Sequence, residues 1–368
     1  MTEIRAQSGD VLVLAGTMKG AFLFHSGPDR DKFEVTGPHF PGHVVYALAF
    51  DGRAGRRRVL AGVSSAHWGA VVRASDDFGA SWSDPAEGNL RFPADTDTAL
   101  ANVWQLRPAG PQAPDTVFAG VEPAALFRSD DAGSTFELVR GLWDHPHREH
   151  WTPGGGGKAI HSIVPHPTDP ARLTVAMSTG GVYVTEDGGE TWAPRNHGIR
   201  AVHVPDPYPE YGHCVHKIAQ HPDRPERFYA QVHHGVYRSD DDAVTWQSIA
   251  EGLPSDFGFP MVVHPHRPDV VYNFPLVADA RRFAPDGRCA VYRSEDAGTS
   301  WDALTDGLPD PFWNAVMRDA MCVDAADRAG IYFGTRAGSV YGSRDDGEHW
   351  RPVVQNLPDV LSVRAVVA

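Results

Sequence analysis

A short acidic turn recurs along this chain, and it constrains the fold more than any other feature. Each copy contains a Ser or Thr, an Asp two positions later and a closing aromatic residue. The six copies are "ASDDFGASW", "RSDDAGSTF", "TEDGGETW", "SDDDAVTW", "SEDAGTSW" and "SRDDGEHW". They end at Trp82, Phe136, Trp192, Trp246, Trp301 and Trp350, and an eroded seventh copy, "FHSGPDRDKF", ends at Phe33. Successive ends are 49 to 56 residues apart, a period typical of repeat architectures.

The turn has a local physical logic. Asp, Ser and Thr side chains can hydrogen-bond the backbone of their own turn, and Gly tolerates positive φ. Each copy follows a short strand such as "ALFRS" and precedes another such as "FELVRGL", so we expect it to cap a hairpin. Two more strands, such as "NVWQLRP" and "TVFAGVE", precede the hairpin. Four strands in each of seven units predict an all-β, seven-bladed β-propeller, expected to form one domain over residues 1–368.

The two ends of the sequence complement each other. The C-terminal "LSVRAVVA" resembles a first strand with no unit after it. The N-terminal "DVLVLAGTMKGAFLF" resembles second and third strands with no first strand. We expect the two ends to complete one blade and close the ring, which removes exposed sheet edges.

The charge, the cysteine content and the hydrophobic pattern of the chain limit the kinds of partner and environment that we expect. The formal net charge of −14 disfavours binding to a phosphate backbone, so we expect no nucleic-acid partner. The three cysteines are irregularly spaced and odd in number, which predicts no disulfide framework. No apolar run approaches the roughly 18 residues that a membrane helix needs, and the N-terminus lacks a signal pattern. We therefore expect a cytoplasmic protein without membrane contact.

The acidic turns resemble the Asp-box, or BNR, repeats of sialidases, sortilin-type domains, xyloglucanases and a plant photosystem assembly factor. The match extends over almost the whole chain. This resemblance implies a propeller whose boxes join third and fourth strands, on the face opposite the functional one. The boxes would then be structural. Because such propellers include enzymes, receptors and scaffolds, the resemblance implies no single activity.

The functional face should be built from hairpins between second and third strands and from loops that lead into first strands. Residues at those positions are rich in His, Lys and Arg although the chain is acidic, which predicts a small polar or anionic, carbohydrate-like ligand in a central funnel. The candidate ligand-binding residues are Lys19, His43, His67, Trp68, Asn102, Trp104, Lys158, His213, Lys217, His233, His234, Arg318 and Arg336.

Two carboxylates at these positions suit glycoside hydrolysis. That reaction needs a pair of carboxyl groups about 5 to 10 Å apart, and Glu122 and Asp319 are the candidate pair. His161 and His216 complete the candidate catalytic set. The leading hypothesis, taken from the family association, is a sialidase-superfamily-like glycosyl hydrolase or a related hydrolase.

Two alternatives stay open. The F/Y-R-I-P stretch of sialidases is missing, and this absence favours a non-catalytic propeller that binds a ligand or a protein partner. The 19 histidines favour a metal-dependent enzyme instead. His161, His216 and His234 are the candidate ligands for zinc or another divalent metal. The sequence itself requires no cofactor.

Overall fold

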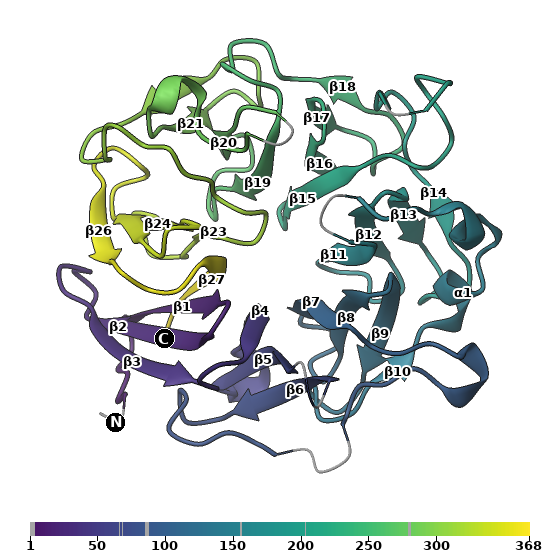
Figure 1. Ribbon diagram of the computed structural model, residues 1–368, viewed down its shortest axis with the longest axis horizontal. Coiled ribbons are helices and arrows are strands. Elements are labelled where there is room, and N and C mark those ends of the chain that lie inside the picture. Colours follow the sequence, from purple (N-terminus) through teal and green to yellow (C-terminus); the bar gives the residue numbers. More distant parts are fainter. Residues whose placement is uncertain are drawn as a thin grey trace.

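The chain folds into seven antiparallel sheets arranged as blades around a central axis (Figure 1). The computed structural model describes residues 4–65, 67, 69–84, 88–154, 157–202, 204–278 and 281–368. Helical structure in these ranges is limited to α1 (Arg140–Trp143) and to 3₁₀ turns at Arg53–Gly55, Ala94–Thr96, Pro146–His150 and Pro285–Gly287. None of the helices described is long and apolar enough to cross a membrane. The predicted seven-bladed β-propeller is confirmed.

Each blade runs outward from an inner strand. The inner strands are β27 (Val360–Val367), β4 (Val44–Asp51), β7 (Asn102–Pro108), β11 (Ala159–Pro165), β15 (Val215–His221), β19 (Gly258–Val263) and β23 (Met321–Val323). The second strands are β1 (Val11–Thr17), β5 (Arg58–Ser65), β8 (Val117–Glu122), β12 (Leu173–Ser178), β16 (Arg224–Val232), β20 (Val271–Pro275) and β24 (Ile331–Gly334).

The outer half of each blade carries the acidic turn. The third strands are β2 (Gly20–Ser26), β6 (Gly69–Ser75), β9 (Ala125–Ser129), β13 (Gly181–Thr185), β17 (Val236–Ser239), β21 (Val291–Ser294) and β25 (Val340–Ser343). The fourth strands are β3 (Glu34–His39), β10 (Glu137–Leu138), β14 (Ala193–Pro194), β18 (Gln247–Ser248), β22 (Asp302–Leu304) and β26 (Arg351–Val354).

One blade departs from the expected four strands. The sheet β4-β5-β6 has three strands within the described residues. A side chain bonds where a fourth strand would pair with β6: Asn89 Oδ1 accepts from the Val72 amide at 3.1 Å, and Asn89 Nδ2 donates to the Val72 carbonyl at 3.0 Å. Asn196 makes the same pair of bonds with Val182 in the four-stranded blade that contains β13, so this side-chain bridge recurs with and without a fourth strand.

The acidic turns satisfy their own polar groups. Ser129 Oγ accepts from the Gly133 amide at 2.8 Å and donates to Asp131 Oδ1 at 2.7 Å. The Thr135 amide and hydroxyl donate to the two oxygens of Asp131 at 2.9 and 2.6 Å. Burial raises the pKa of Asp131, but these hydrogen bonds outweigh it and hold the pKa below its usual value. Since its carboxylate is occupied within the turn, Asp131 acts as a structural residue, as predicted for the repeat.

The closing aromatic residues join neighbouring blades. Trp246 Nε1 donates to the carbonyl oxygen of Arg195 at 2.9 Å, and Trp301 Nε1 donates to that of Ile249 at the same distance. Both acceptors belong to the preceding blade. These two rings therefore fasten their blades to the preceding ones, whereas Trp192 Nε1 donates to the Gly189 carbonyl within its own turn.

The two ends of the chain meet in one sheet, as expected. Its order is β27-β1-β2-β3, and β1 pairs antiparallel with β27 from Val11, opposite Val367, to Thr17, opposite Val360. The C-terminal strand is thus the innermost strand of a blade whose other strands come from the N-terminus (Figure 1).

A buried ion pair ties this closing blade to its neighbour. Arg30 lies in the eroded seventh turn, between β2 and β3, and donates to Asp324 Oδ2 at 3.2 Å and to the Arg328 carbonyl at 2.9 Å. Asp324 also accepts from the Tyr332 hydroxyl at 2.9 Å and the Gly330 amide at 2.7 Å. Both charged side chains are buried, so each depends on the other to offset its lost hydration.

Arg30→Ala should lower the free energy of unfolding by about 3 kcal/mol or more, because it leaves Asp324 buried without its cation. Chemical denaturation followed by circular dichroism measures the change. The control Arg344→Ala removes a half-exposed arginine that pairs with Asp31 and should cost about 1 kcal/mol at most. Equal losses in the two variants would contradict this role for Arg30.

Candidate functional site

Six inner strands carry an extra residue near their start. In β4, β7, β11, β15 and β27 the pairing with the second strand skips one residue, and in β19 two residues lie opposite one. A β-bulge of this kind re-aims a side chain. In β27 the skipped residue is Leu361. The bulged residues of the other five strands, which we call the bulge ring, are Tyr46, Trp104, His161, His216 and Phe259.

Glycines on the second strands let the bulged strands approach one another. A Cβ atom at Gly62 of β5 would lie 2.7 Å from Val103 Cβ in the next blade, and one at Gly120 of β8 would lie 2.3 Å from the Ile160 carbonyl oxygen. Val103 and Ile160 immediately precede the bulged residues Trp104 and His161. Close packing at these two glycines therefore brings members of the bulge ring together around the axis.

Arg318 lies against the bulge ring. Its guanidinium carbon is 4.8 Å from the ring centroid of Trp104 and 5.9 Å from that of Phe259. Tyr46 packs on Trp104 with the two centroids 4.2 Å apart, and His216 stacks on Phe259 at 4.7 Å. Arg318 is 5% exposed, and its Nε has no hydrogen-bond partner in the part of the chain that the structure describes. Other arginines also have such a nitrogen, but most of them pair with a carboxylate, whereas Arg318 has no ion pair among the described side chains, which marks it as a candidate binding group.

The next residue, Asp319, anchors this segment. Its Oδ1 accepts from Lys217 Nζ at 2.6 Å and from Arg364 at 2.9 Å. Its carbonyl oxygen accepts from the Val363 amide of β27 at 2.7 Å. Burial raises the pKa of Asp319, but the two cations outweigh burial and hold the pKa below its usual value. Asp319 is 1% exposed, so its carboxylate is an internal counter-ion.

A cavity of about 290 Å³ lies on the axis beyond Asp319 and is lined by six of the seven inner strands. Three cationic side chains line it: Arg107, Lys217 and Arg364. Arg107 is exposed to this space although protein surrounds it. Loss of hydration, followed by repulsion from Arg364, lowers its pKa. Arg107 was not among the predicted site residues. Its place on the same inner-strand face as Lys217 becomes visible only when the strands are paired.

Both histidines of the bulge ring are held in the neutral form. Burial, followed by the charge of Arg318, lowers the pKa of His161 and of His216 well below the usual value. His161 Nδ1 lies 3.2 Å from Ser162 Oγ, and its buried Nε2 has no partner within the described ranges. His216 Nδ1 lies 2.6 Å from the Gly258 carbonyl oxygen and donates to it.

Glu122, predicted as a catalytic carboxylate, supports the bulge ring. It ends β8 and accepts from Trp104 Nε1 at 3.0 Å and from Asn102 Nδ2 at 3.2 Å. A Cβ at Gly157 would lie 2.2 Å from Glu122 Oε1, so this glycine leaves room for the carboxylate. The contacts orient Trp104 beside Arg318.

The remaining predicted residues are spread over several environments. His213 is buried and donates from Nε2 to the Ile199 carbonyl at 3.0 Å. Lys158 Nζ donates to the Arg148 carbonyl at 3.3 Å, and Arg336 pairs with Asp359. Lys19 and His67 are exposed, and His43, His233 and His234 are partly buried. Trp68 lies outside the described residues.

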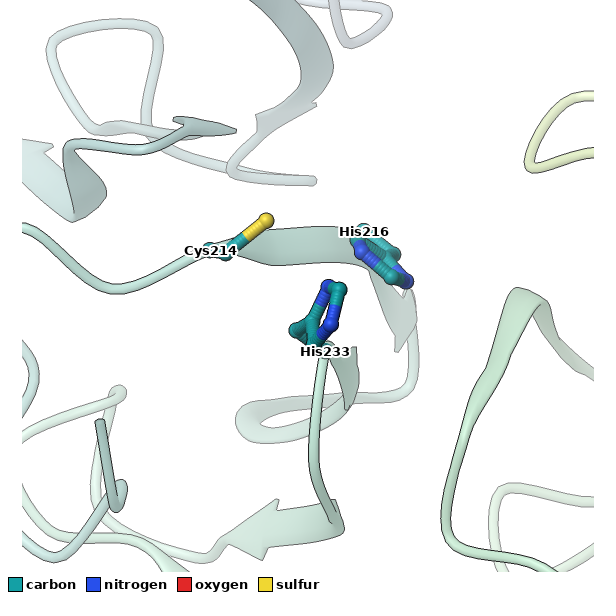
Figure 2. A group of neighbouring side chains, drawn as sticks. All are labelled: Cys214, His216 and His233. Atoms are coloured by element: carbon teal, nitrogen blue, oxygen red, sulfur yellow. The ribbon is translucent and has the colours of Figure 1, made fainter. Parts of the chain in front are cut away.

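The predicted metal ligands are only partly brought together. The structure groups His216 with Cys214 and His233 rather than with His161 and His234, and the ligating atoms of the three lie within 4.8 Å of one another (Figure 2). Cys214 precedes β15 and His233 follows β16. Their backbones are bonded, because the His233 amide donates to the Cys214 carbonyl at 2.9 Å.

Comparisons with known proteins bear on the fold. No protein-family model matches the chain, and no curated protein matches it in sequence. The structure of YCF48 bound to D1 peptide is similar, with a TM-score of 0.52 and 12% identity over 96% of this chain and 88% of that one. YCF48 from Cyanidioschyzon merolae has a TM-score of 0.52 and 13% sequence identity, over 86% of this chain and 87% of that one. An ancestral GH74 enzyme has a TM-score of 0.47 and 13% identity, over 95% of this chain and 54% of that one. At these identities the YCF48 likeness extends to the fold alone, and the GH74 likeness is too low to support an argument.

The neutral state of His161 predicts a pH effect. Below about pH 6.5 the unfolded chain gains a proton at this residue, whereas the folded chain does not. The free energy of unfolding therefore decreases as the pH is lowered. His161→Gln should reduce that slope by up to about 1.4 kcal/mol per pH unit between pH 6.5 and 5.5. Urea denaturation at each pH measures it. Above pH 7.5 both proteins should show equal slopes, and an unchanged slope below pH 6.5 would contradict the prediction.

Proposed function

We propose that this chain is a binding propeller whose funnel receives a carboxylate-bearing peptide at Arg318. The observation that carries the proposal is the buried guanidinium of Arg318, whose Nε has no hydrogen-bond partner among the described residues. Burying an unpaired charge is costly. A carboxylate bound at the terminal N–H groups of the guanidinium would offset that cost.

The surrounding cations are engaged elsewhere. Lys217 and Arg364 both donate to Asp319, and Arg336 pairs with Asp359. The positive charge of Arg318 has no such counter-ion among the described side chains. An anion entering the funnel would therefore meet Arg318 as a cation whose charge these pairs do not neutralise.

The flanking rings suit a planar ion pair. A guanidinium stacked on aromatic faces keeps its N–H edge directed outward, and that edge can hold a carboxylate through two parallel hydrogen bonds. Trp104 and Phe259 supply these faces, and Glu122 fixes Trp104 through its indole nitrogen. The rings also offer apolar surface for the part of the ligand next to its carboxylate.

A peptide is the ligand class that we favour. YCF48, a propeller similar in fold, is described with a bound D1 peptide, so this architecture can accommodate a peptide. A chain terminus or an acidic side chain would carry the required carboxylate, and the aromatic members of the bulge ring would contact its neighbours.

The geometry does not favour the hydrolase hypothesis, which stays a prediction. Glycoside hydrolysis requires one carboxyl group that can act as an acid. Asp319 is ionised and paired with Lys217 and Arg364. Glu122 is engaged by Trp104 and Asn102. Neither carboxylate is free of protein partners.

The test uses pools of random hexapeptides with a free C-terminal carboxylate, together with the same pools as C-terminal amides. Retained peptides are then measured by titration calorimetry. Arg318→Gln should weaken binding about 10- to 100-fold, because charge-assisted hydrogen bonds contribute about 1.5–3 kcal/mol. Arg318→Lys should also weaken binding, because lysine cannot form the bidentate pair.

The matched control is Arg336→Gln, which removes an exposed arginine that already pairs with Asp359. It should leave peptide affinity unchanged. Circular dichroism and thermal melting establish that each variant is folded. Equally tight binding of peptides that carry no carboxylate at the terminus or in a side chain, or an unchanged affinity in folded Arg318→Gln, would overturn the proposal.

A further inference from the structure

We propose that Cys214, His216 and His233 form a zinc-binding site beside the funnel. The site provides one thiolate and two imidazole nitrogens, a donor set suited to Zn²⁺. This proposal is independent of peptide binding at Arg318.

Backbone pairing at the start of β15 brings the three side chains together. Cys214 immediately precedes β15, and His216 is the bulged residue of that strand, so the bulge sets the direction of its side chain. His233 follows β16, where its amide bonds to the Cys214 carbonyl at 2.9 Å. Figure 2 shows Cys214 and His216 along one strand, with His233 reaching toward them from the neighbouring segment. Cys214 and His233 lie just outside β15 and β16, and the hydrogen bond between their backbones holds these two residues together.

The ligating atoms form one small cluster and lie within 4.8 Å of one another. In tetrahedral coordination, bonds of about 2.3 Å to sulfur and about 2.1 Å to nitrogen place the ligand atoms about 3.4 to 3.6 Å apart. Side-chain rotations that shorten the longest separation by about 1 Å would close the site.

A neighbouring carbonyl selects the tautomer of His216. Its Nδ1 lies 2.6 Å from the Gly258 carbonyl oxygen, which can only accept a hydrogen bond, so Nδ1 carries the proton. Nε2 then holds the lone pair that a metal requires. A backbone carbonyl bonded to the second ring nitrogen is the usual support of a metal-binding histidine. Burial also lowers the pKa of His216, which keeps the ring neutral and able to bind metal.

The thiol is the ligand that a metal must deprotonate. Burial raises the pKa of Cys214 to about 11, although Arg318 and Arg282 act in the opposite direction. Zinc must therefore displace the thiol proton, and apparent affinity should increase with pH. Three protein ligands would leave a fourth position on the ion for water or for another ligand.

The experiment uses the full chain, freed of metal by a chelator and dialysed against Zn²⁺ or Co²⁺. We expect one equivalent of zinc by elemental analysis. With Co²⁺ we expect a thiolate-to-cobalt charge-transfer band that zinc abolishes. Cys214→Ser should remove the band, and His233→Gln should reduce zinc content to less than one-tenth of an equivalent. Cys322→Ser, which changes a buried cysteine outside the group, should keep both signals.

Two results would overturn the zinc proposal. One is a folded wild-type protein that retains less than one-tenth of an equivalent of zinc. The other is a charge-transfer band that persists in folded Cys214→Ser. Neither result affects the peptide measurement, which is read through Arg318, and loss of peptide binding in Arg318→Gln would leave the zinc stoichiometry unchanged.

Discussion

The antiparallel pairing of β27 with β1 is the interaction on which the rest of this structure depends. It joins the two ends of the chain in one blade and closes the ring. It also places Val363 and Arg364 beside Asp319, whose carbonyl and carboxylate they bond. Since Arg318 is the adjacent residue, closure of the ring determines where its guanidinium lies.

Charge pairing then divides the centre of the molecule into two environments. Asp319 takes Lys217 and Arg364 as partners next to the axial cavity. Arg318 contacts Trp104 and Phe259 instead, and aromatic faces offer no charge neutralisation. This is the physical reason for locating the binding site in the bulge ring and for treating the carboxylates, which are already paired, as supports.

Much of the fold could be predicted from the sequence. The spacing of the acidic turns reflects local chemistry, and each end of the chain carries only part of the strands of one blade. The three-stranded sheet was not predicted, because its acidic turn matches those of the four-stranded blades. Bulges were also missed, because an extra residue is defined only against its partner strand. Trp104 and Arg318 were predicted separately, and their contact was not. The repeated "AGV" stretches containing Gly62 and Gly120 were an unused signal for the close approach of neighbouring blades.

The measurement that tests the central claim most directly is a crystal structure of the protein bound to a hexapeptide with a free C-terminal carboxylate. The account predicts that a carboxylate lies within hydrogen-bond distance of the Arg318 guanidinium, with the adjoining residues over Trp104 and Phe259. A peptide seated on the rim of acidic turns, or one whose carboxylates all lie away from Arg318, would contradict it.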